Sequence, residues 1–440
     1  MELVEVLPGA LYWLSSASAS APAAAPLVGP CRVDYISVGS EFVYRGFARD
    51  FGPLHLGQVA TFCRRLNEKL RAIGVGVDAL DNQADASDAR VCVHVPMTPQ
   101  LRANAVCLLG CWAILCRGWS AERAYAPFQH LRLPCFHDAS QQEDGFGLTV
   151  LHVLQGLERA VRCGLFRLQD FDETAYLEDM DPQTRDLSWI TPRIAAFAGP
   201  QSRSHTSGWC LGPTPQEYVD YFVVRQVKVV VRLNRPKYHK TLFENAGIQV
   251  VDLFFPDGTC PSERIVEQFL QLCEQHEPKN IAVHCKAGLG RTGTLIACLL
   301  IQKYAFSAEQ AIGWLRLCRP GSIIGGQQQF LRDLQPHIHA VDSLQQPQDE
   351  EESSNQVSSS SLITKGIVRR APEAKADQRP YPTPVTLLKP PRPPKIPGRL
   401  SPTTTTMNKQ ADFLLMRKHA LAVESCPLRP LSPTSLRKTK

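Results

Sequence analysis

The sequence predicts an α/β protein made of two domains that are joined by a linker and followed by a disordered tail. In the second half, a β-branched run at residues 281–283 precedes a glycine-containing loop and an apolar helical segment at 294–304. In the first half, a strand-like run at 90–95 precedes a long apolar segment at 105–116. Strands that alternate with helices indicate sheets covered by helices. The chain has 440 residues, a length that favours two domains over one.

Changes in composition along the chain give the domain limits. The first domain covers residues 1–166 and contains an Ala/Ser/Pro stretch at 17–30 that predicts an inserted loop. A polar, acidic linker covers 167–192, and the second domain covers 193–340. Residues 343–440 hold 14 of the chain's 34 prolines, together with serine and threonine runs. Such a segment cannot bury enough apolar surface to offset the entropy lost on folding, so we expect it to be disordered.

The positive charge of the chain is concentrated in this tail. The whole chain carries a net charge of +6, and residues 343–440 contain 16 Lys and Arg against 8 Asp and Glu. A basic tail can bind nucleic acid, acidic proteins or membrane surfaces, although most charge blocks of this kind are only solvated. Residues 389–397 have the PxxP character of an SH3 ligand, and 411–423 fit a short amphipathic docking helix. We therefore expect the tail to bind regulatory partners and expect no chemistry on nucleic acid.

Cysteine usage and apolar runs predict an intracellular protein. The 15 cysteines form no CxxC pair, and residues 1–8 contain two glutamates and no basic residue, unlike a signal peptide. The longest apolar runs, near 105–116 and 294–301, are too short to span a bilayer, so we expect no membrane insertion. The histidines, including His337 and His339, lack metal-ligand spacing with the cysteines. We therefore predict no metal and no other cofactor.

Residues 284–292, which read HCKAGLGRT, carry the strongest signal for chemistry. Cys285 lies six positions before Arg291, with two glycines between them. A strand, a glycine loop and a helix N-terminus in this order form an anion cradle, because backbone N–H groups and the positive end of the helix dipole face one spot. The loop positions expected to contact the bound anion are Lys286, Ala287, Gly288, Leu289 and Gly290.

Such a cradle would change the chemistry of Cys285. A free thiol has a pKa of about 8.5, which a helix N-terminus and a nearby guanidinium can lower by several units. Cys285 would then be a thiolate that can attack phosphorus, and Arg291 offers a planar fork for two phosphate oxygens. The hydroxyl of Thr292 can donate to the sulfur, and His284 is expected to orient the loop from behind. This pattern predicts hydrolysis of phosphate monoesters through a cysteinyl-phosphate.

Asp257 is the candidate general acid. A thiolate nucleophile needs a partner that protonates the leaving alkoxide. Asp257 lies 28 residues before Cys285, with two phenylalanines upstream and a glycine downstream, which is typical of a mobile loop that closes over a substrate. An Asp-Gly pair is also common in ordinary turns. Position alone therefore leaves both interpretations open.

Several motifs together resemble one known family. The extended loop VHCKAGLGRTGTLIAC, the segment DLFFPDG and the segment RPGSIIGGQQQFL are joined upstream by DFGPLHL, RANA, FDE and VVRLN. Over about residues 10–340, the chain resembles the cell division cycle 14 family of dual-specificity protein phosphatases, within the cysteine-based protein tyrosine phosphatase superfamily. The resemblance implies two tandem dual-specificity-phosphatase-like domains, of which only the second is catalytic.

The resemblance also implies roles for individual residues. It makes Cys285 the nucleophile, Arg291 the phosphate clamp and Asp257 the general acid. Gln327 and Gln328 resemble the family's glutamine pair, which is expected to place the hydrolytic water. The implied setting is cell-cycle control opposite proline-directed cyclin-dependent kinases, in the nucleus or cytoplasm or at the centrosome or spindle.

The first domain lacks the residues for thiol chemistry. Its strand at 90–95 ends near His94, where a phosphate loop would start, and the next residues are Val-Pro-Met-Thr-Pro-Gln-Leu-Arg. No cysteine follows His94, and two prolines stand where glycines are needed. We therefore expect this domain to shape the substrate site or to support the second domain.

The implied substrates are phosphoserine or phosphothreonine followed by proline, with a basic residue shortly after. The family binds that basic residue in an acidic groove built partly from the linker, and Glu173 and Glu178 are the candidate acids here. The linker reads FDETAYLEDMD, whereas the family usually reads close to FDVDEYEHYE. Several family acids therefore fall on uncharged residues, which are Thr174, Ala175, Leu177 and Met180. An acidic run of this kind is often only a solvated face.

Three functions remain open. We predict a cysteine-dependent phosphatase of phosphoprotein substrates that acts on phosphoserine and phosphothreonine, with phosphotyrosine as a further substrate. A phosphoinositide phosphatase of the phosphatase-and-tensin-homologue type is an alternative, since its loop resembles HCKAGKGR and Lys286 matches. Leu289, however, replaces the second lysine that would neutralise an inositol headgroup. A non-catalytic scaffold for phosphoproteins is the third interpretation, and the intact Cys285, Arg291 and Asp257 oppose it.

Overall fold

The computed structural model describes residues 1–21, 31–76, 89–143, 145–201, 212–345 and 417–418, without the side chains of 337–345. The predictions for the tail, its PxxP segment and its amphipathic helix therefore lie almost entirely outside the described residues. The same holds for most of the 17–30 loop and for the side chains of His337 and His339.

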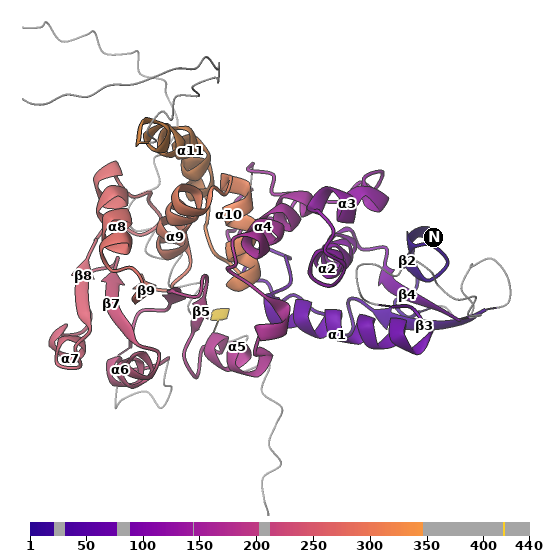
Figure 1. The fold of residues 1–440 in the computed structure, drawn as a ribbon, viewed down its shortest axis with the longest axis horizontal. Coiled ribbons are helices and arrows are strands. Elements are labelled where there is room, and N and C mark those ends of the chain that lie inside the picture. Colours follow the sequence, from indigo (N-terminus) through magenta and orange to yellow (C-terminus); the bar gives the residue numbers. More distant parts are fainter. Residues whose placement is uncertain (22–30, 77–88, 144, 202–211, 346–416, 419–440) are drawn as a thin grey trace, which may run out of the picture. The chain divides into compact units, whose positions relative to one another are not determined.

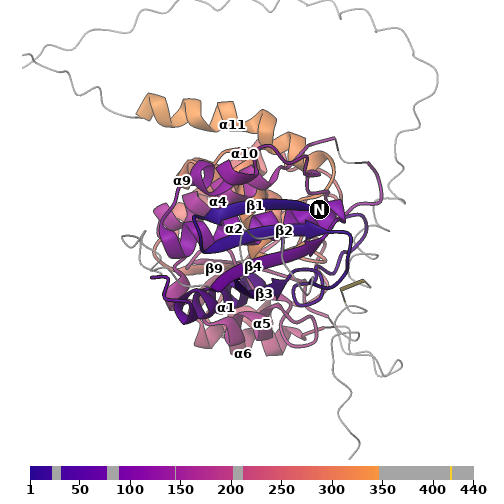
Figure 2. The same cartoon turned by 90° about the vertical axis from the view of Figure 1, so that its right-hand side faces the viewer.

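The first domain is built on a four-stranded sheet in the order β1-β2-β4-β3 (Figure 2). The strands are β1 (Glu2–Leu7), β2 (Leu11–Ser16), β3 (Arg32–Ser37) and β4 (Ala89–Pro96). β1 runs antiparallel to β2, while β4 is parallel to both β2 and β3. The central strand β4 is rich in valine and almost wholly buried, as expected for a strand that is covered on both faces.

Four α-helices accompany this sheet. They are α1 (Leu56–Ala72), α2 (Pro99–Arg117), α3 (Ala121–Tyr125) and α4 (Val150–Arg162). Of the described helices, α2 is the one that is long and apolar enough to cross a membrane, with a mean hydropathy of 1.2 over its most apolar window. Two thirds of that window (67%) is buried inside the domain. The apolar run at 105–116 thus belongs to a longer helix, whose composition is explained by its place in the core.

The second domain contains a five-stranded sheet in the order β5-β6-β9-β7-β8. The strands are β5 (Leu187–Trp189), β6 (Ile194–Phe197), β7 (Val227–Arg232), β8 (Gln249–Asp252) and β9 (Asn280–His284). The end of the segment assigned to the linker, 167–192, thus supplies the edge strand of this sheet. β5 runs antiparallel to β6, and the other pairs are parallel. Both domains therefore place one antiparallel strand beside a parallel set, and β4 and β9 occupy matching central positions.

Helices cover both faces of this second sheet (Figure 1). They are α6 (Pro215–Val224), α7 (Thr241–Glu244), α8 (Glu263–Gln275), α9 (Gly290–Tyr304), α10 (Ala308–Cys318) and α11 (Gly326–Gln345). Alternate strand residues face opposite sides. Val230 and Ala282 pack with α6 and α7, whereas Val229, Val231 and Val283 belong to the core on the side of α8, α9 and α10. The predicted α/β fold of two domains is confirmed.

The two domains meet where α4 and α10 pack together. A Cβ atom on Gly156 would lie 2.4 Å from the carbonyl oxygen of Gln310, and one on Gly313 would lie 2.8 Å from the Cα of Val153. The two glycines therefore let the helix backbones approach closely. The linker helix α5 (Glu173–Met180) is tied to the second domain, since the hydroxyl of Tyr176 donates to the carbonyl oxygen of Cys318 at 3.0 Å.

Candidate active site

The candidate site is built on residues 285–289, here called the cysteine loop, between the end of β9 and the start of α9. Gly288 has a φ of +65°, and a Cβ atom there would lie only 2.1 Å from the carbonyl oxygen of Phe197. No other residue can adopt this conformation so close to β6. The first N–H groups of α9 have no partner within the helix and point toward the loop, which is the arrangement that binds anions.

Cys285 lies at the start of the loop and is almost completely buried. Burial alone would raise the pKa of its thiol, but the positive charge of Arg291 and a hydrogen bond from Thr292 outweigh it and lower that pKa. Thr292 Oγ1 is itself buried and has no hydrogen-bond partner of ordinary geometry among the described residues. The Cys285 sulfur is therefore the group to which this hydroxyl can donate a hydrogen bond.

The guanidinium of Arg291, in the first turn of α9, is fixed from two sides. Its Nη1 donates to the carbonyl oxygen of Phe255 at 3.1 Å and approaches that of Leu233 at 3.4 Å. Its Nη2 lies 3.0 Å from Oδ1 of Asp257. Its Nε is buried and has no partner among the described residues. A phosphate oxygen bound at the cysteine loop would accept a hydrogen bond from this Nε–H group.

Asp257 follows β8 in the chain and is mostly buried beside Arg291. Burial raises the pKa of its carboxyl group, and the charges of Arg291 and Lys286 oppose that rise without cancelling it. The protonated form is therefore more populated than in a solvent-exposed aspartate. The structure thus brings Cys285, Arg291 and Asp257 together, as expected from the sequence.

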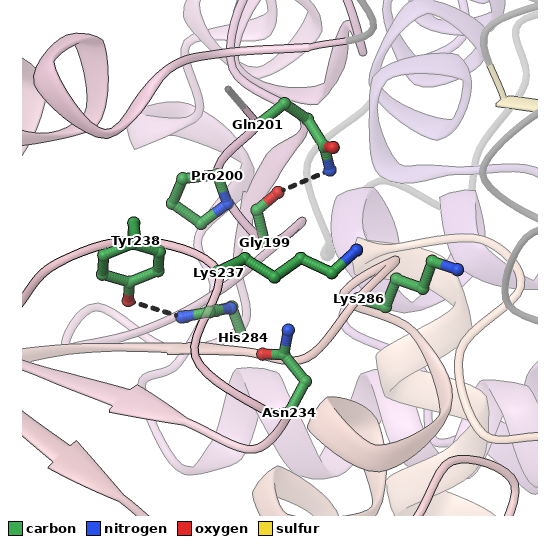
Figure 3. Close-up of a pocket in the computed structure, with 8 residues that line it drawn as sticks. All are labelled: Gly199, Pro200, Gln201, Asn234, Lys237, Tyr238, His284 and Lys286. Atoms are coloured by element: carbon green, nitrogen blue, oxygen red, sulfur yellow. Dashed lines mark hydrogen bonds between the residues drawn. The ribbon is translucent and has the colours of Figure 1, made fainter. Parts of the chain in front are cut away.

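His284 lies behind the loop and supports it. Its Nδ1 lies 2.9 Å from the carbonyl oxygen of Cys285, and its Nε2 lies 2.8 Å from the hydroxyl of Tyr238. Burial lowers the pKa of His284 to about 4, so the ring is neutral at physiological pH. Nδ1 then donates to the carbonyl oxygen, and Nε2 accepts from Tyr238. No sequence pattern singles out Tyr238, since its contact with His284 (Figure 3) depends on the pairing of β7 with β9.

The two glutamines of the 319–331 segment lie in different environments. Gln327 lies beside the loop, because a Cβ atom on Gly290 would be 2.8 Å from its Oε1, and its Nε2 donates to the carbonyl oxygen of Thr259 at 3.1 Å. The Oε1 of Gln328 instead accepts from Nη2 of Arg316 at 2.9 Å. Gln327 therefore lies between the start of α9 and the segment that carries Asp257, whereas Arg316 holds the side chain of Gln328.

The candidate linker acids have partners outside the cysteine loop. Glu173 binds Thr61 and Arg64 on α1 of the first domain. Glu178 is exposed and pairs with Arg185 at 2.8 Å. The structure therefore does not bring either carboxylate to Cys285.

A different linker acid, Asp186, lies next to the cysteine loop. Its Oδ1 accepts from Nη2 of Arg319 at 2.6 Å and from Nζ of Lys418 at 2.5 Å. Arg319 in turn donates to the carbonyl oxygen of Gly288 at 2.7 Å, and Lys418 donates to that of Ala287 at 3.1 Å. Burial would raise the pKa of Asp186, but these two cations lower it, so Asp186 remains a carboxylate.

The first domain supplies an apolar wall to the site. Phe47 and Ala139 pack against Ala287 and Leu289 of the cysteine loop, with Ile324 at the edge, and these five residues are called the wall cluster below. Leu289 is fully buried in this cluster. Position 289 therefore faces the first domain, which explains why an apolar residue stands there. The matching loop of the first domain, after His94, contains no cysteine.

Family models match both halves of the described chain. The model described as "Dual specificity protein phosphatase, N-terminal half" matches residues 5–160. The model described as "Polymorphic toxin system, DSP-PTPase phosphatase" matches residues 212–305.

Curated relatives match over most of this chain. The mouse protein "Dual specificity protein phosphatase CDC14B" is 39% identical over 301 residues, which cover 68% of this chain and 59% of that protein. Human "Dual specificity protein phosphatase CDC14A" is 39% identical over 308 residues, or 69% and 50% of the two chains. The Schizosaccharomyces pombe "Tyrosine-protein phosphatase CDC14 homolog" is 35% identical over 350 residues, or 77% and 62%. The matches span only 50% to 62% of the length of these relatives. The chain belongs to the CDC14 family of dual-specificity protein phosphatases.

Proposed function

We propose that this chain is a protein phosphatase that hydrolyses phosphoserine, phosphothreonine and phosphotyrosine through a cysteinyl-phosphate, and that it opposes proline-directed cyclin-dependent kinases in the cell cycle. The observation that carries this proposal is the convergence of three groups on one loop. The pKa of Cys285 is lowered, Arg291 is fixed with its Nε unpartnered, and Asp257 lies 3.0 Å from Arg291. Family membership supports the same reaction class.

In the first step, the Cys285 thiolate attacks phosphorus and the bond to the leaving oxygen breaks. Arg291 and the first N–H groups of α9 hold the phosphate oxygens where negative charge develops. A bound phosphate dianion draws the guanidinium away from Asp257, which removes the charge that opposes protonation of this carboxyl group. Asp257 then gives its proton to the leaving alkoxide.

In the second step, water hydrolyses the cysteinyl-phosphate. Asp257, now ionised, accepts a proton from the water, since the group that acts as acid in the first step is the base in the second. Gln327 lies beside Gly290 and is bonded to Thr259, so it can position the water between the loop and Asp257. Thr292 donates to the departing thiolate and stabilises it. Inorganic phosphate leaves, and the free thiolate is restored.

Two features support a preference for phosphoserine followed by proline and a basic residue. Most of the wall cluster is buried, but Ile324 at its edge is partly exposed next to the cysteine loop and offers an apolar contact for a proline ring. Asp186 already holds one ammonium group, that of Lys418, beside the carbonyl oxygen of Ala287. A basic side chain of the substrate would have to displace Lys418 to bind this buried carboxylate. Asp186 is therefore a further candidate for this role, beside Glu173 and Glu178.

Kinetics on three phosphopeptides test this proposal. The peptides carry phosphoserine-Pro with a lysine three positions later, the same sequence without the lysine, and phosphotyrosine. Turnover of the first peptide with the highest kcat/KM, lost in Cys285→Ser and strongly reduced in Asp257→Ala, is the expected result. Folded native protein that turns over none of the peptides would contradict the proposal and favour the scaffold interpretation.

A further inference from the structure

Asp138, in the connection that precedes α4, is a carboxylate of the first domain that contacts the segment carrying Gln327. It is only 2% exposed, and its Oδ2 accepts a hydrogen bond from the backbone N–H of Gly325, 187 positions later in the chain. The same oxygen lies 3.5 Å from Nε2 of Gln328. A buried carboxylate is stable only where such donors replace its hydration. The contact therefore ties the first domain to the glutamine segment of the second.

The surroundings of Asp138 hold its carboxylate in one orientation. The hydroxyl of Ser140 donates to Oδ1 of Asp138 at 2.6 Å, so each carboxylate oxygen has its own donor. Two positions before Asp138, Phe136 is fully buried, and its N–H donates to the carbonyl oxygen of Leu148 at 2.7 Å. Because these contacts lie within the first domain, they anchor Asp138 there and fix the direction in which its Oδ2 points.

Gly325 connects this carboxylate to Gln327. The Oε1 of Gln327 accepts from the N–H of Ile324 at 3.1 Å, and its own N–H approaches the carbonyl oxygen of Ile324 at 3.4 Å. Gly325 lies between these two residues with a φ of +60°, and Gly326 follows it. Two consecutive glycines have more backbone freedom than any other pair, so the turn gains most from a hydrogen bond that holds it in one conformation. The carboxylate of Asp138 supplies that hydrogen bond.

A second observation brings the same two segments together. Ala139 and Ile324, the chain neighbours of Asp138 and Gly325, both belong to the wall cluster. Apolar packing and a hydrogen bond thus act together to join the first domain to the turn before Gln327. A change at Asp138 would reach Gln327 through this turn, while the wall cluster would still join the two segments.

We infer that Asp138 is a positioning residue that holds Gln327 in place for hydrolysis of the cysteinyl-phosphate, so that the first domain acts on the second step of the reaction. This inference rests on the proposed function, because it requires a cysteinyl-phosphate and a water placed by Gln327. In this role Asp138 touches neither the substrate nor the reacting atoms. Its carboxylate acts through the backbone of Gly325, and its effect is on breakdown of the intermediate rather than on its formation.

Rapid-mixing kinetics with 4-nitrophenyl phosphate test the inference, because a burst of nitrophenol reports the first step and the steady state that follows reports the second. In Asp138→Ala, the burst should keep the native rate, and the steady state should be roughly tenfold slower than in native protein, as for loss of one hydrogen bond to a charged group. Asp179→Ala is the matched control. Asp179 is also a buried carboxylate, 5% exposed, but it accepts from the hydroxyl of Tyr221 on α6 at 2.6 Å. Its loss should lower stability and leave the steady state unchanged.

Further variants separate positioning from charge and from stability. Asp138→Asn keeps one oxygen that can accept from Gly325, while its NH₂ group can donate to Ser140, so its steady state should stay close to that of native protein. Adding Asp138→Ala to Gln327→Ala should cause little further slowing, because both changes act on one step through one residue. Should Asp138→Ala not fold, Asp138→Leu removes the acceptor and keeps the side-chain volume.

Three outcomes would overturn the inference. One is a native steady-state rate in a folded Asp138→Ala or Asp138→Leu protein. Another is slowing of the burst alone, which would assign Asp138 to substrate binding. The third is slowing in Asp138→Asn as large as in Asp138→Ala, since the charge rather than the hydrogen bond would then matter. Failure of the proposed function looks different, because Gln327→Ala would then show no burst and no phosphate on Cys285.

Discussion

Arg291 and Asp257 face each other beside the cysteine loop, with Nη2 of the arginine 3.0 Å from Oδ1 of the aspartate. The contact joins the group that would bind phosphate to the group that would protonate the leaving oxygen. Because a bound phosphate competes for the same guanidinium, substrate binding itself would release Asp257 for proton transfer. Binding of phosphate in the cysteine loop would thus favour the protonated form of Asp257.

The first prediction concerns pH. The proposed mechanism needs Cys285 ionised and Asp257 protonated. The pKa of Cys285 is lowered, since Arg291 and Thr292 outweigh burial, and the pKa of Asp257 is raised by burial against Arg291. Activity should therefore rise as pH rises through the thiol pKa and fall as pH rises through the Asp257 pKa. Asp257→Asn should lower kcat about 100-fold or more and remove the falling limb of the kcat/KM profile. A falling limb that survives in this variant would assign it to another group.

The second prediction concerns Gly288. In Gly288→Ala the new Cβ atom would lie 2.1 Å from the carbonyl oxygen of Phe197, so the cysteine loop must shift and activity should be lost. Gly247→Ala is the matched control. Gly247 also has a positive φ, +73°, but a Cβ atom there meets nothing within 4 Å. The control should lose about 1–2 kcal/mol of stability from backbone strain alone and keep its kcat. Full activity in Gly288→Ala would contradict the close packing of the loop on β6.

The third prediction separates the two glutamines. Gln327→Ala should slow breakdown of the cysteinyl-phosphate roughly ten- to hundredfold, because the attacking water loses its positioning. Rapid-mixing kinetics should then show a burst of released alcohol before a slow steady state. Gln328→Ala should instead lower stability by about 1–3 kcal/mol, since Arg316 loses a buried acceptor. A burst that appears in Gln328→Ala and not in Gln327→Ala would reverse the assignment.

The fourth prediction concerns Lys418, which binds Asp186, the carboxylate proposed to hold a basic residue of the substrate. Its ammonium lies 2.5 Å from the carboxylate, and Lys418→Ala would leave that position for a basic residue of the substrate. In Lys418→Ala, the KM of the lysine-containing peptide should fall roughly three- to tenfold relative to the KM of the lysine-free peptide. Burial lowers the pKa of Lys418 to about 8, so the positive charge is present below that pH and is lost as pH rises through it. The KM values of the native protein should therefore approach those of Lys418→Ala as the pH rises above about 8.

Asp186→Asn provides the control for this prediction. It removes the carboxylate that both cations share, so the two peptides should then have similar KM values whether or not Lys418 is present. A preference for the lysine-containing peptide that persists in Asp186→Asn would place the basic-residue site elsewhere.

The cysteine loop could be predicted from the sequence because its determinants are local. Cys285, Gly288 and Arg291 lie within seven consecutive positions, and a strand and a helix flank them directly. The α/β fold followed from the same alternation of strands and apolar helices. Asp257 needed the family resemblance, because an Asp-Gly pair alone is compatible with an ordinary turn.

The surroundings of the loop could not be predicted, because they depend on segments that are distant in sequence. Asp186 binds Arg319, 133 positions later, and Glu173 binds Thr61, 112 positions earlier. Composition shows that the linker is acidic and does not show which carboxylate the tertiary fold brings to the loop.

The most direct test of the account is to look for phosphate on Cys285 during turnover. Gln327→Ala is mixed with a phosphoserine-Pro peptide, quenched early and digested, and the fragment that contains Cys285 is analysed by mass spectrometry. The account predicts a phosphate on Cys285 that decays as product accumulates and that never forms in Cys285→Ser. Steady hydrolysis by Cys285→Ser, or turnover in which the Cys285 fragment stays unmodified, would contradict a cysteinyl-phosphate mechanism.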